Sequence, residues 1–208
     1  MGTARVVFDR WEGRYATRMA DVRSSAVRDL FGAATRSDVI SLSGGMPEIS
    51  RVPADVVARI AAAGVREDAR EALQYGSSEG RPGLREVIVE LMAEIGVRLK
   101  AEQIIVTAGA QQALDLLAKV FIDPGDIVIT EGPTYLGALQ AFSAYQPKVI
   151  CIPMDAEGMR VDVLEERLRE LGPRGAKFIY TIPNFQNPAG VTLSAQRRRR
   201  LLELAREY

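Results

Sequence analysis

Hydrophobic and polar positions in the second half of the chain follow two alternating periods. Short β-branched and apolar runs predict strands at 103–107, 127–130, 148–153 and 177–182. Apolar residues at helical spacing predict helices at 111–121, 135–145, 161–171 and 194–208. Strands that alternate with helices of about ten residues are typical of an α/β fold, in which a mainly parallel sheet carries helices on both faces.

The first half of the chain is less regular. Its pattern predicts a helix at 25–34, a strand at 39–42, a break at 44–47, and helices at 53–70 and 84–95. We therefore separate an N-terminal arm, 1–50, from an α/β region, 51–208. The sheet of this region is expected to be incomplete, because a parallel sheet would continue after the last helix.

Individual side chains add detail to three of these predicted elements. Leu114, Leu117 and Phe121 lie at helical spacing and predict the buried stripe of their helix. Residues 155–158 have the composition of a turn. Ser194 is a candidate N-cap for the last helix, and the four arginines at 197–200 are interpreted as a solvated basic face.

Composition removes several classes of function. Lysine plus arginine and aspartate plus glutamate both number 27, so bulk charge points to no nucleic-acid partner and no acidic membrane. The N-terminus has no apolar core of a signal peptide, no apolar run approaches a membrane span, and the one cysteine forms no internal disulfide, so we expect a cytoplasmic protein. No histidine is present, which excludes serine–histidine triads and, with one cysteine, the usual zinc sites, so no metal is expected.

Ligands of parallel α/β sheets bind at the carboxyl ends of the strands, which marks the segments 108–112, 131–135 and 183–190. The first places small residues at a helix start, which is either an anion-binding site or a plain tight turn. Tyr135 in the second either lies beside a ligand or packs on the sheet edge. Asn187 in the third precedes a proline, so its amide either contacts a ligand or belongs to a turn before a helix.

Five segments, in this order and spacing, resemble those of the class I/II aminotransferases of fold type I, which use pyridoxal 5′-phosphate (PLP). They read LSGGMP, LQYGSSEGRPGLREV, VTAGAQQALDLLAKVFIDPGD, EGPTYLGALQAF and YTIPNFQNPAGVTLS. The resemblance runs from about residue 24 to residue 208. Within the family, the sequence resembles most the α-aminoadipate/kynurenine, LysN-like branch. It implies that 1–50 is the N-terminal arm with part of the small domain, and that 51–208 is the N-terminal portion of the PLP-binding large domain.

The resemblance assigns cofactor-binding roles to five residues of the strand-end segments. Gly109, Ala110 and Gln111 match the helix start that binds the PLP phosphate. Tyr135 matches the aromatic residue that stacks on the pyridine ring, and Asn187 matches the amide that bonds the O3′ oxygen. Many relatives carry serine in place of Ala110, so a hydroxyl contact worth about 1 kcal/mol is missing here.

Three further matches concern the partner subunit and the substrate. Tyr75 matches a tyrosine that reaches the cofactor phosphate of the partner subunit, which implies a homodimer with shared active sites. Gly45 matches a glycine beside the substrate, and Arg28 falls near an arginine that meets an acidic substrate side chain. The segment GGMPEISRVP departs from the family spacing, so no substrate specificity is carried over.

The implied reaction moves an amino group between an amino acid and a 2-oxoacid. In the family, the Schiff-base lysine, the pyridinium-binding aspartate and the carboxylate-binding arginine all follow the segment 183–190, beyond Tyr208 in this numbering. The lysines present are Lys100, Lys119, Lys148 and Lys177, and none matches the Schiff-base position. The sequence is therefore expected to be an inactive N-terminal fragment with no catalytic residue of its own.

Three other interpretations stay open at this point. One is an aminotransferase-like regulator of the MocR type, against which we count the short segment that precedes the aminotransferase region. Another is a non-enzymatic PLP-binding or dimerisation module. The last is a different fold type I PLP enzyme such as a β-lyase, because the motifs specify the cofactor more than the reaction.

Overall fold

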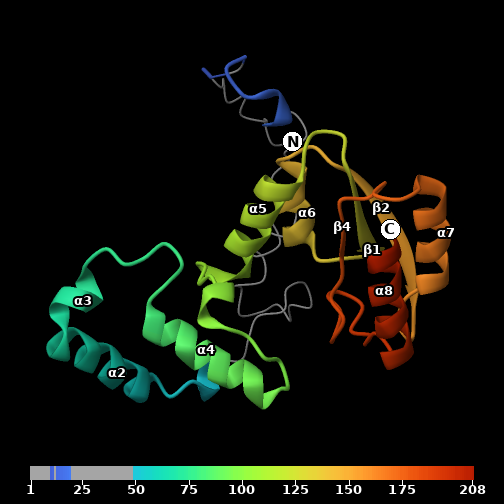
Figure 1. The fold of residues 1–208 in the computed structure, drawn as a ribbon. Coiled ribbons are helices and arrows are strands. Elements are labelled where there is room, and N and C mark those ends of the chain that lie inside the picture. The colour runs from blue at the N-terminus through green and yellow to red at the C-terminus, as the bar shows by residue number, and fades with distance from the viewer. Residues whose placement is uncertain (1–9, 12, 20–48) are drawn as a thin grey trace, which may run out of the picture. The chain divides into compact units, whose positions relative to one another are not determined.

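The computed structural model of the chain describes residues 10, 11, 13–19 and 49–208 (Figure 1). The predicted helix at 25–34, the strand at 39–42 and the break at 44–47 lie outside these residues. The described residues fall into two compact units, one of Gly109–Tyr208 with the described residues before 20, and one of 49–108. The domain boundary predicted near residue 50 stays a prediction.

The unit of residues 49–108 is helical. Its α-helices are α2 (Ala54–Glu67), α3 (Ala69–Leu73) and α4 (Pro82–Glu94). The 3-10 turn η2 (Ile49–Arg51) precedes them and the 3-10 turn η3 (Ala101–Gln103) follows them. The single helix predicted at 53–70 is wrong at its end, because Asp68 interrupts it and caps α3 by accepting a hydrogen bond from the Glu71 amide at 3.0 Å. The helix predicted at 84–95 is confirmed and begins at Pro82, in the first turn where proline costs no hydrogen bond.

The strand predicted at 103–107 is wrong. Residues 101–103 form η3, and Ile104 then has the extended backbone of a strand, with φ −116° and ψ 129°. The Val106 amide donates to the Glu79 carbonyl at 2.9 Å, in the loop before α4 and not in a paired strand. A β-branched run becomes a strand only when a neighbouring strand pairs with it, and no described segment does so here.

The unit of residues 109–208 is built on a four-stranded sheet of order β3-β2-β1-β4. Its strands are β1 (Ile127–Gly132), β2 (Lys148–Asp155), β3 (Gly158–Met159) and β4 (Phe178–Tyr180). β1 is parallel to both β2 and β4, as predicted for a mainly parallel sheet. β3 was not predicted: it leaves the predicted turn at 155–158 and pairs antiparallel with the end of β2.

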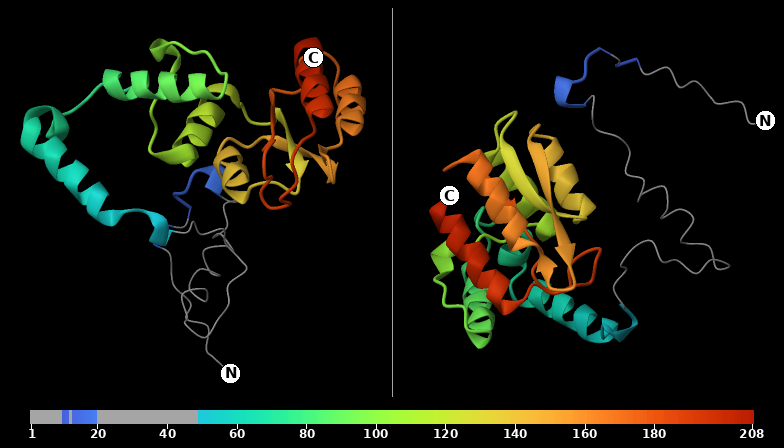
Figure 2. Two further views of the ribbon diagram at one scale, coloured as in Figure 1. Left: turned by 90° about the horizontal axis from the view of Figure 1, so that it is seen from below. Right: turned by 90° about the vertical axis from the view of Figure 1, so that its right-hand side faces the viewer.

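Helices cover both faces of this sheet, as Figure 2 shows. They are α5 (Gly109–Phe121) and α6 (Leu136–Ser143) in one layer, and α7 (Val161–Leu171) and α8 (Ala195–Glu207) in the other. Successive side chains of β1 enter opposite layers, with Val128 in the cluster of α5 and α6 and Ile129 in the cluster of α7 and α8. None of the helices in the described ranges combines the length and apolar character that a membrane span requires.

The buried face of α5 differs from the predicted stripe. Ala118 is fully buried and Leu114 packs against the same cluster, whereas the side chains of Leu117 and Phe121 are 51% and 52% exposed. Leu117 and Phe121 instead line an apolar groove beside β4. The helical period is therefore correct, but the face that meets the sheet is rotated from the predicted stripe.

The arginines at the start of α8 are not the predicted solvated face. The Arg197 side chain is only 17% exposed and donates to both carboxylate oxygens of Asp155, at 2.6 and 2.7 Å. It also donates to the carbonyl of Gly158 at 3.0 Å, which fastens the β2–β3 hairpin to α8. The Ser194 N-cap is confirmed, because its hydroxyl accepts from the Arg197 amide at 3.4 Å.

Replacing Phe142 tests the layer between α6 and the sheet. Its ring is 1% exposed and meets the rings of Phe178 and Tyr180 edge-on, with centroids 5.4 and 5.5 Å away. Phe142→Ala is expected to lower the free energy of unfolding by about 3–5 kcal/mol, because it removes a buried ring and leaves a cavity. Denaturant unfolding measures the loss, with the exposed Val120→Ala as a control expected within about 0.5 kcal/mol. Equal losses for the two variants would contradict this packing.

The Asp155–Arg197 contact predicts a pH dependence. The guanidinium of Arg197, and then the Glu157 amide, lower the pKa of Asp155 to about 2. A pKa below the unfolded value of about 3.9 means that the contact stabilises fully above pH 4 and is lost as pH falls towards about 2. An NMR titration should place the Asp155 midpoint near 2, and Asp155→Asn should reduce the loss of stability over this window. Glu170→Gln is the control, because it removes an exposed ion pair with Arg167. An Asp155 titration midpoint near 4 would refute the contact with Arg197.

Candidate functional site

The first predicted segment lies at the start of α5. Gly109 begins the helix with φ +75°, a left-handed conformation that glycine adopts without strain. The amides of a helix's first turn have no acceptor within their own helix, and the helix dipole favours an anion beside them. The backbone of Gly109, Ala110 and Gln111 forms this helix start, and its role toward an anion stays a prediction.

The second predicted segment follows β1 and includes Tyr135, the N-cap residue of α6. The Tyr135 ring lies over Gly137, where an added Cβ would come within 2.5 Å of the ring. Glycine at 137 is thus what lets the ring take this position, which leaves Tyr135 38% exposed. The side-chain Nε2 of Gln111 donates to the Gly137 carbonyl at 2.8 Å, so the start of α5 is tied to the start of α6.

The third predicted segment follows β4 and carries Asn187, whose side chain is exposed. Its neighbour Gln186 is 2% exposed and donates from Nε2 to the Pro133 carbonyl, at 2.9 Å. This bond joins the Asn187 loop to the Tyr135 loop, as Gln111 joins the Tyr135 loop to α5. The structure therefore brings Gly109, Tyr135 and Asn187 to one edge of the sheet, and their roles toward a ligand stay predictions.

Sequence reasoning missed the buried carboxylate beneath this edge. Glu131 is 1% exposed at the end of β1, and it accepts hydrogen bonds from Thr181 Oγ1 at 2.5 Å and Gln186 Nε2 at 2.9 Å. Burial, and then the negative charge of Glu131, raise the pKa of Tyr180. The available signal was a glutamate inside the apolar run IVITEG, because a buried carboxylate requires a set of donors.

One polar atom at this edge has no protein partner. The hydroxyl oxygen of Thr134 is buried, and it makes no hydrogen bond within the described part of the chain. Thr134 directly precedes Tyr135 in the loop after β1. A buried hydroxyl normally finds a partner, so Thr134 is an unsatisfied polar group in the loop that carries Tyr135.

The remaining predicted residues are not placed with this edge. Tyr75 belongs to the unit of 49–108, where its side chain is 101% exposed beside a cavity of about 590 Å³. Gly45 and Arg28 lie outside the described residues. The roles of all three stay predictions.

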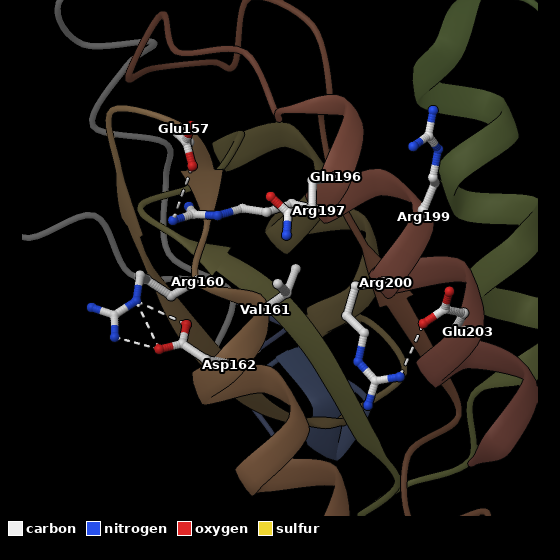
Figure 3. Close-up of a pocket in the computed structure, with 9 residues that line it drawn as sticks. All are labelled: Glu157, Arg160, Val161, Asp162, Gln196, Arg197, Arg199, Arg200 and Glu203. Carbon is white, nitrogen blue, oxygen red and sulfur yellow. Dashed lines mark hydrogen bonds and ion pairs between the residues drawn. The ribbon is translucent and has the colours of Figure 1, made fainter.

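A separate cavity of about 580 Å³ lies between the starts of α7 and α8, and Figure 3 shows its lining. Although several arginines line it, their charges are mostly matched by carboxylates. Arg160 pairs with Asp162, and Arg200 pairs with Glu203 at 3.0 Å. The Arg160 guanidinium lowers the pKa of Asp162. None of the predicted site residues lines this cavity, and its paired charges do not favour an anion.

Comparison with known proteins supports the sequence resemblance. The family model "Aminotransferase class I and II" matches residues 37–208. The chain is 46% identical over 201 residues to aromatic-amino-acid aminotransferase 1 of Thermococcus litoralis, covering 95% of this chain and 48% of that protein. It is 39% identical over 197 residues to 2-aminoadipate transaminase of Thermus thermophilus, again covering 95% and 48%.

The fold is likewise that of solved aminotransferases. The Pyrococcus horikoshii kynurenine aminotransferase, solved in complex with PMP, superposes with a TM-score of 0.86 at 44% identity, over 96% of this chain and 50% of that one. The chain thus spans about half the length of the curated relatives it matches. This likeness confirms the predicted fold type I architecture with an incomplete large domain. The chain belongs to the aminotransferase class I and II family.

Proposed function

We propose that the protein is the N-terminal part of a PLP-dependent aminotransferase that moves an amino group between an amino acid and a 2-oxoacid. The observation that carries the proposal is that hydrogen bonds join three predicted segments at one edge of the sheet. Gln111 bonds Gly137 and Gln186 bonds Pro133. These bonds join the three segments that match the family's phosphate, ring and O3′ contacts, which supports one shared site. The kynurenine aminotransferase similar to this chain was solved with PMP, which supports the same cofactor class.

The residues present fit the cofactor. The amides at the start of α5 suit a phosphate, the partly exposed ring of Tyr135 suits a flat aromatic ring, and the exposed amide of Asn187 suits a phenolic oxygen. The buried hydroxyl of Thr134 adds an uncommitted polar group. The bound cofactor would supply an electron sink for the substrate carbanion, while these residues bind and orient it.

Substrate and partner assignments also belong to this proposal. The names of the relatives, aromatic-amino-acid aminotransferase and 2-aminoadipate transaminase, favour amino acids with large or acidic side chains. Gly45 and Arg28 would lie by the substrate. Tyr75, which is fully exposed in its own unit, would reach the cofactor of a second copy in a cytoplasmic homodimer. No nucleic acid or membrane partner is proposed.

None of the lysines in the unit of 109–208 lies at the proposed site. Lys148 begins β2 and Lys177 directly precedes β4, at the amino ends of parallel strands, opposite the edge that carries Asn187. Lys177 also forms an ion pair with Asp126, with Nζ 3.3 Å from Oδ2. Lys119 lies near the end of α5 and Lys100 lies in the other unit. We therefore propose that these residues bind the cofactor without covalent attachment and without catalysing transfer.

The proposal predicts binding without turnover. The purified 208-residue chain is expected to bind PLP, and inorganic phosphate is expected to compete, because the first turn of α5 binds the phosphate group. Equilibrium dialysis with PLP, with and without phosphate, measures both effects. Incubation with an amino acid and a 2-oxoacid should give no new amino acid. Failure to bind PLP would refute the proposed site, and turnover would refute the proposed inactivity.

Gly109 tests the phosphate end of the site. Gly109→Ala is expected to weaken both PLP and inorganic phosphate roughly tenfold, because alanine at φ +75° costs about 1–2 kcal/mol and displaces the first turn. The added Cβ meets nothing within 4 Å, so a clash is not the cause.

Gly64→Ala is the matched control for that experiment. Gly64 lies within α2, where an added Cβ also meets nothing within 4 Å, and its replacement is expected to stabilise the helix by about 0.5–1 kcal/mol. PLP binding should be unchanged. Equal effects of the two variants on PLP binding would contradict the proposed role of Gly109.

A further inference from the structure

The buried carboxylate of Glu131 is held entirely by neutral donors. Oε1 accepts from Thr181 Oγ1 at 2.5 Å, both oxygens accept from the Ile182 amide at 3.2 Å, and Oε2 accepts from Gln186 Nε2 at 2.9 Å. None of these donors is a lysine or an arginine. A carboxylate that only accepts fixes which atom each neighbour must present to it.

The first consequence falls on Gln186, whose amide can take only one orientation. Its Nε2 donates to Glu131 and to the Pro133 carbonyl at 2.9 Å, while its Oε1 accepts from the Ala189 amide at 2.8 Å. Turning the amide over would set Oε1 against two acceptors and Nε2 against a donor. Glu131 and Gln186 therefore act as one rigid link, from the end of β1 to both loops.

The link ends beside the two residues assigned to the cofactor ring. Pro133 lies two residues before Tyr135, and Ala189 lies two residues after Asn187. The Asn187 side chain is exposed and makes no hydrogen bond to another described residue, so its position depends on the backbone around it. The charge of Glu131 also reaches this edge, since it contributes to the raised pKa of Tyr180.

We propose that Glu131 and Gln186 are positioning residues, which hold the Tyr135 loop and the Asn187 loop at the spacing that the cofactor ring requires. The inference rests on the proposed function, because it explains how Tyr135 and Asn187 are held for the ring contacts proposed there. Neither side chain is assigned a contact with the ring, and the hydrogen bonds named above for both are with the protein. Both act through the backbone of the loops, Gln186 on the Pro133 carbonyl and on the Ala189 amide.

The experiment compares two ligands on the 208-residue chain. Glu131→Gln keeps the shape of the side chain but leaves one acceptor oxygen in place of two. That single oxygen must then serve Ile182 and Gln186, while the new amide meets the Thr181 hydroxyl, so the link is weakened. PLP is expected to bind about tenfold more weakly, whereas inorganic phosphate, which uses only the start of α5, should bind as to the unchanged chain. Hydrogen exchange of the Ala189 amide, measured without any ligand, should become faster.

Thr181→Val is the matched control, since it removes a donor to the same carboxylate but leaves the bond to Gln186. It should lower the thermal midpoint as Glu131→Gln does, yet keep PLP affinity within about twofold and keep the Ala189 amide protected. If Thr181→Val weakens PLP as much as Glu131→Gln does, the role is general stability and the proposal is overturned.

An exchanged pair gives a rescue test. In Glu131→Gln with Gln186→Glu, the amide at 131 can donate to the carboxylate at 186, which can still accept from Ala189 but can no longer donate to Pro133. Protection of the Ala189 amide should return, with part of the PLP affinity. If Glu131→Gln does not fold, Gln186→Met replaces it in the binding experiment. This variant removes the bonds of the Gln186 side chain and keeps the Glu131 carboxylate with its other donors.

The outcomes separate this inference from the proposed function. Unchanged PLP affinity in both Glu131→Gln and Gln186→Met, with binding by the unchanged chain intact, overturns the positioning role alone. An unchanged chain that binds no PLP overturns the proposed function, and the positioning role with it. Loss of PLP affinity with phosphate affinity retained, absent in Thr181→Val, supports both.

Discussion

The unit of residues 109–208 depends on β1 being buried on both of its faces. Val128 and Ile129 are completely buried in opposite helical layers, and β2 and β4 pair with the two edges of the strand. A strand enclosed on four sides cannot slip by one residue without moving its apolar side chains into the wrong layer. The position of its carboxyl end, and so of the loop that follows, is fixed by this enclosure.

That carboxyl end carries the one feature that an apolar strand would not need. Glu131 lies in the buried end of β1, where a carboxylate is stable only because every direction around it offers a donor. The donors come from the segment after β4, so the buried charge ties together two loops that the sheet alone would merely place side by side. Glu131 is buried, while the side chains of Tyr135 and Asn187 in the loops beside it are exposed. Exposed side chains supported by a rigid buried layer are the arrangement expected of a binding site.

The arginine run of α8 illustrates how neighbouring residues acquire unrelated roles. Consecutive residues of a helix point about 100° apart, so four arginines in a row surround the helix and do not form one face. Arg197 reaches the β2–β3 hairpin, Arg198 donates to the Pro183 carbonyl at 2.7 Å, and Arg200 meets Glu165 at 2.9 Å. Three of the four therefore hold the fold together, two of them next to loops at the carboxyl edge.

The sequence by itself determined the α/β class and the order of the elements in the unit of 109–208 other than β3, because periodicity is local. It predicted the edge at which a ligand would bind. It also identified the family, through five motifs in the family's order. Tertiary structure decided that 103–107 does not become a strand, which face of α5 is buried, and that Glu131 meets Gln186, 55 residues away. Each of these depends on a partner distant in sequence, and a hydrogen bond or a buried face exists only once that partner has been brought to it.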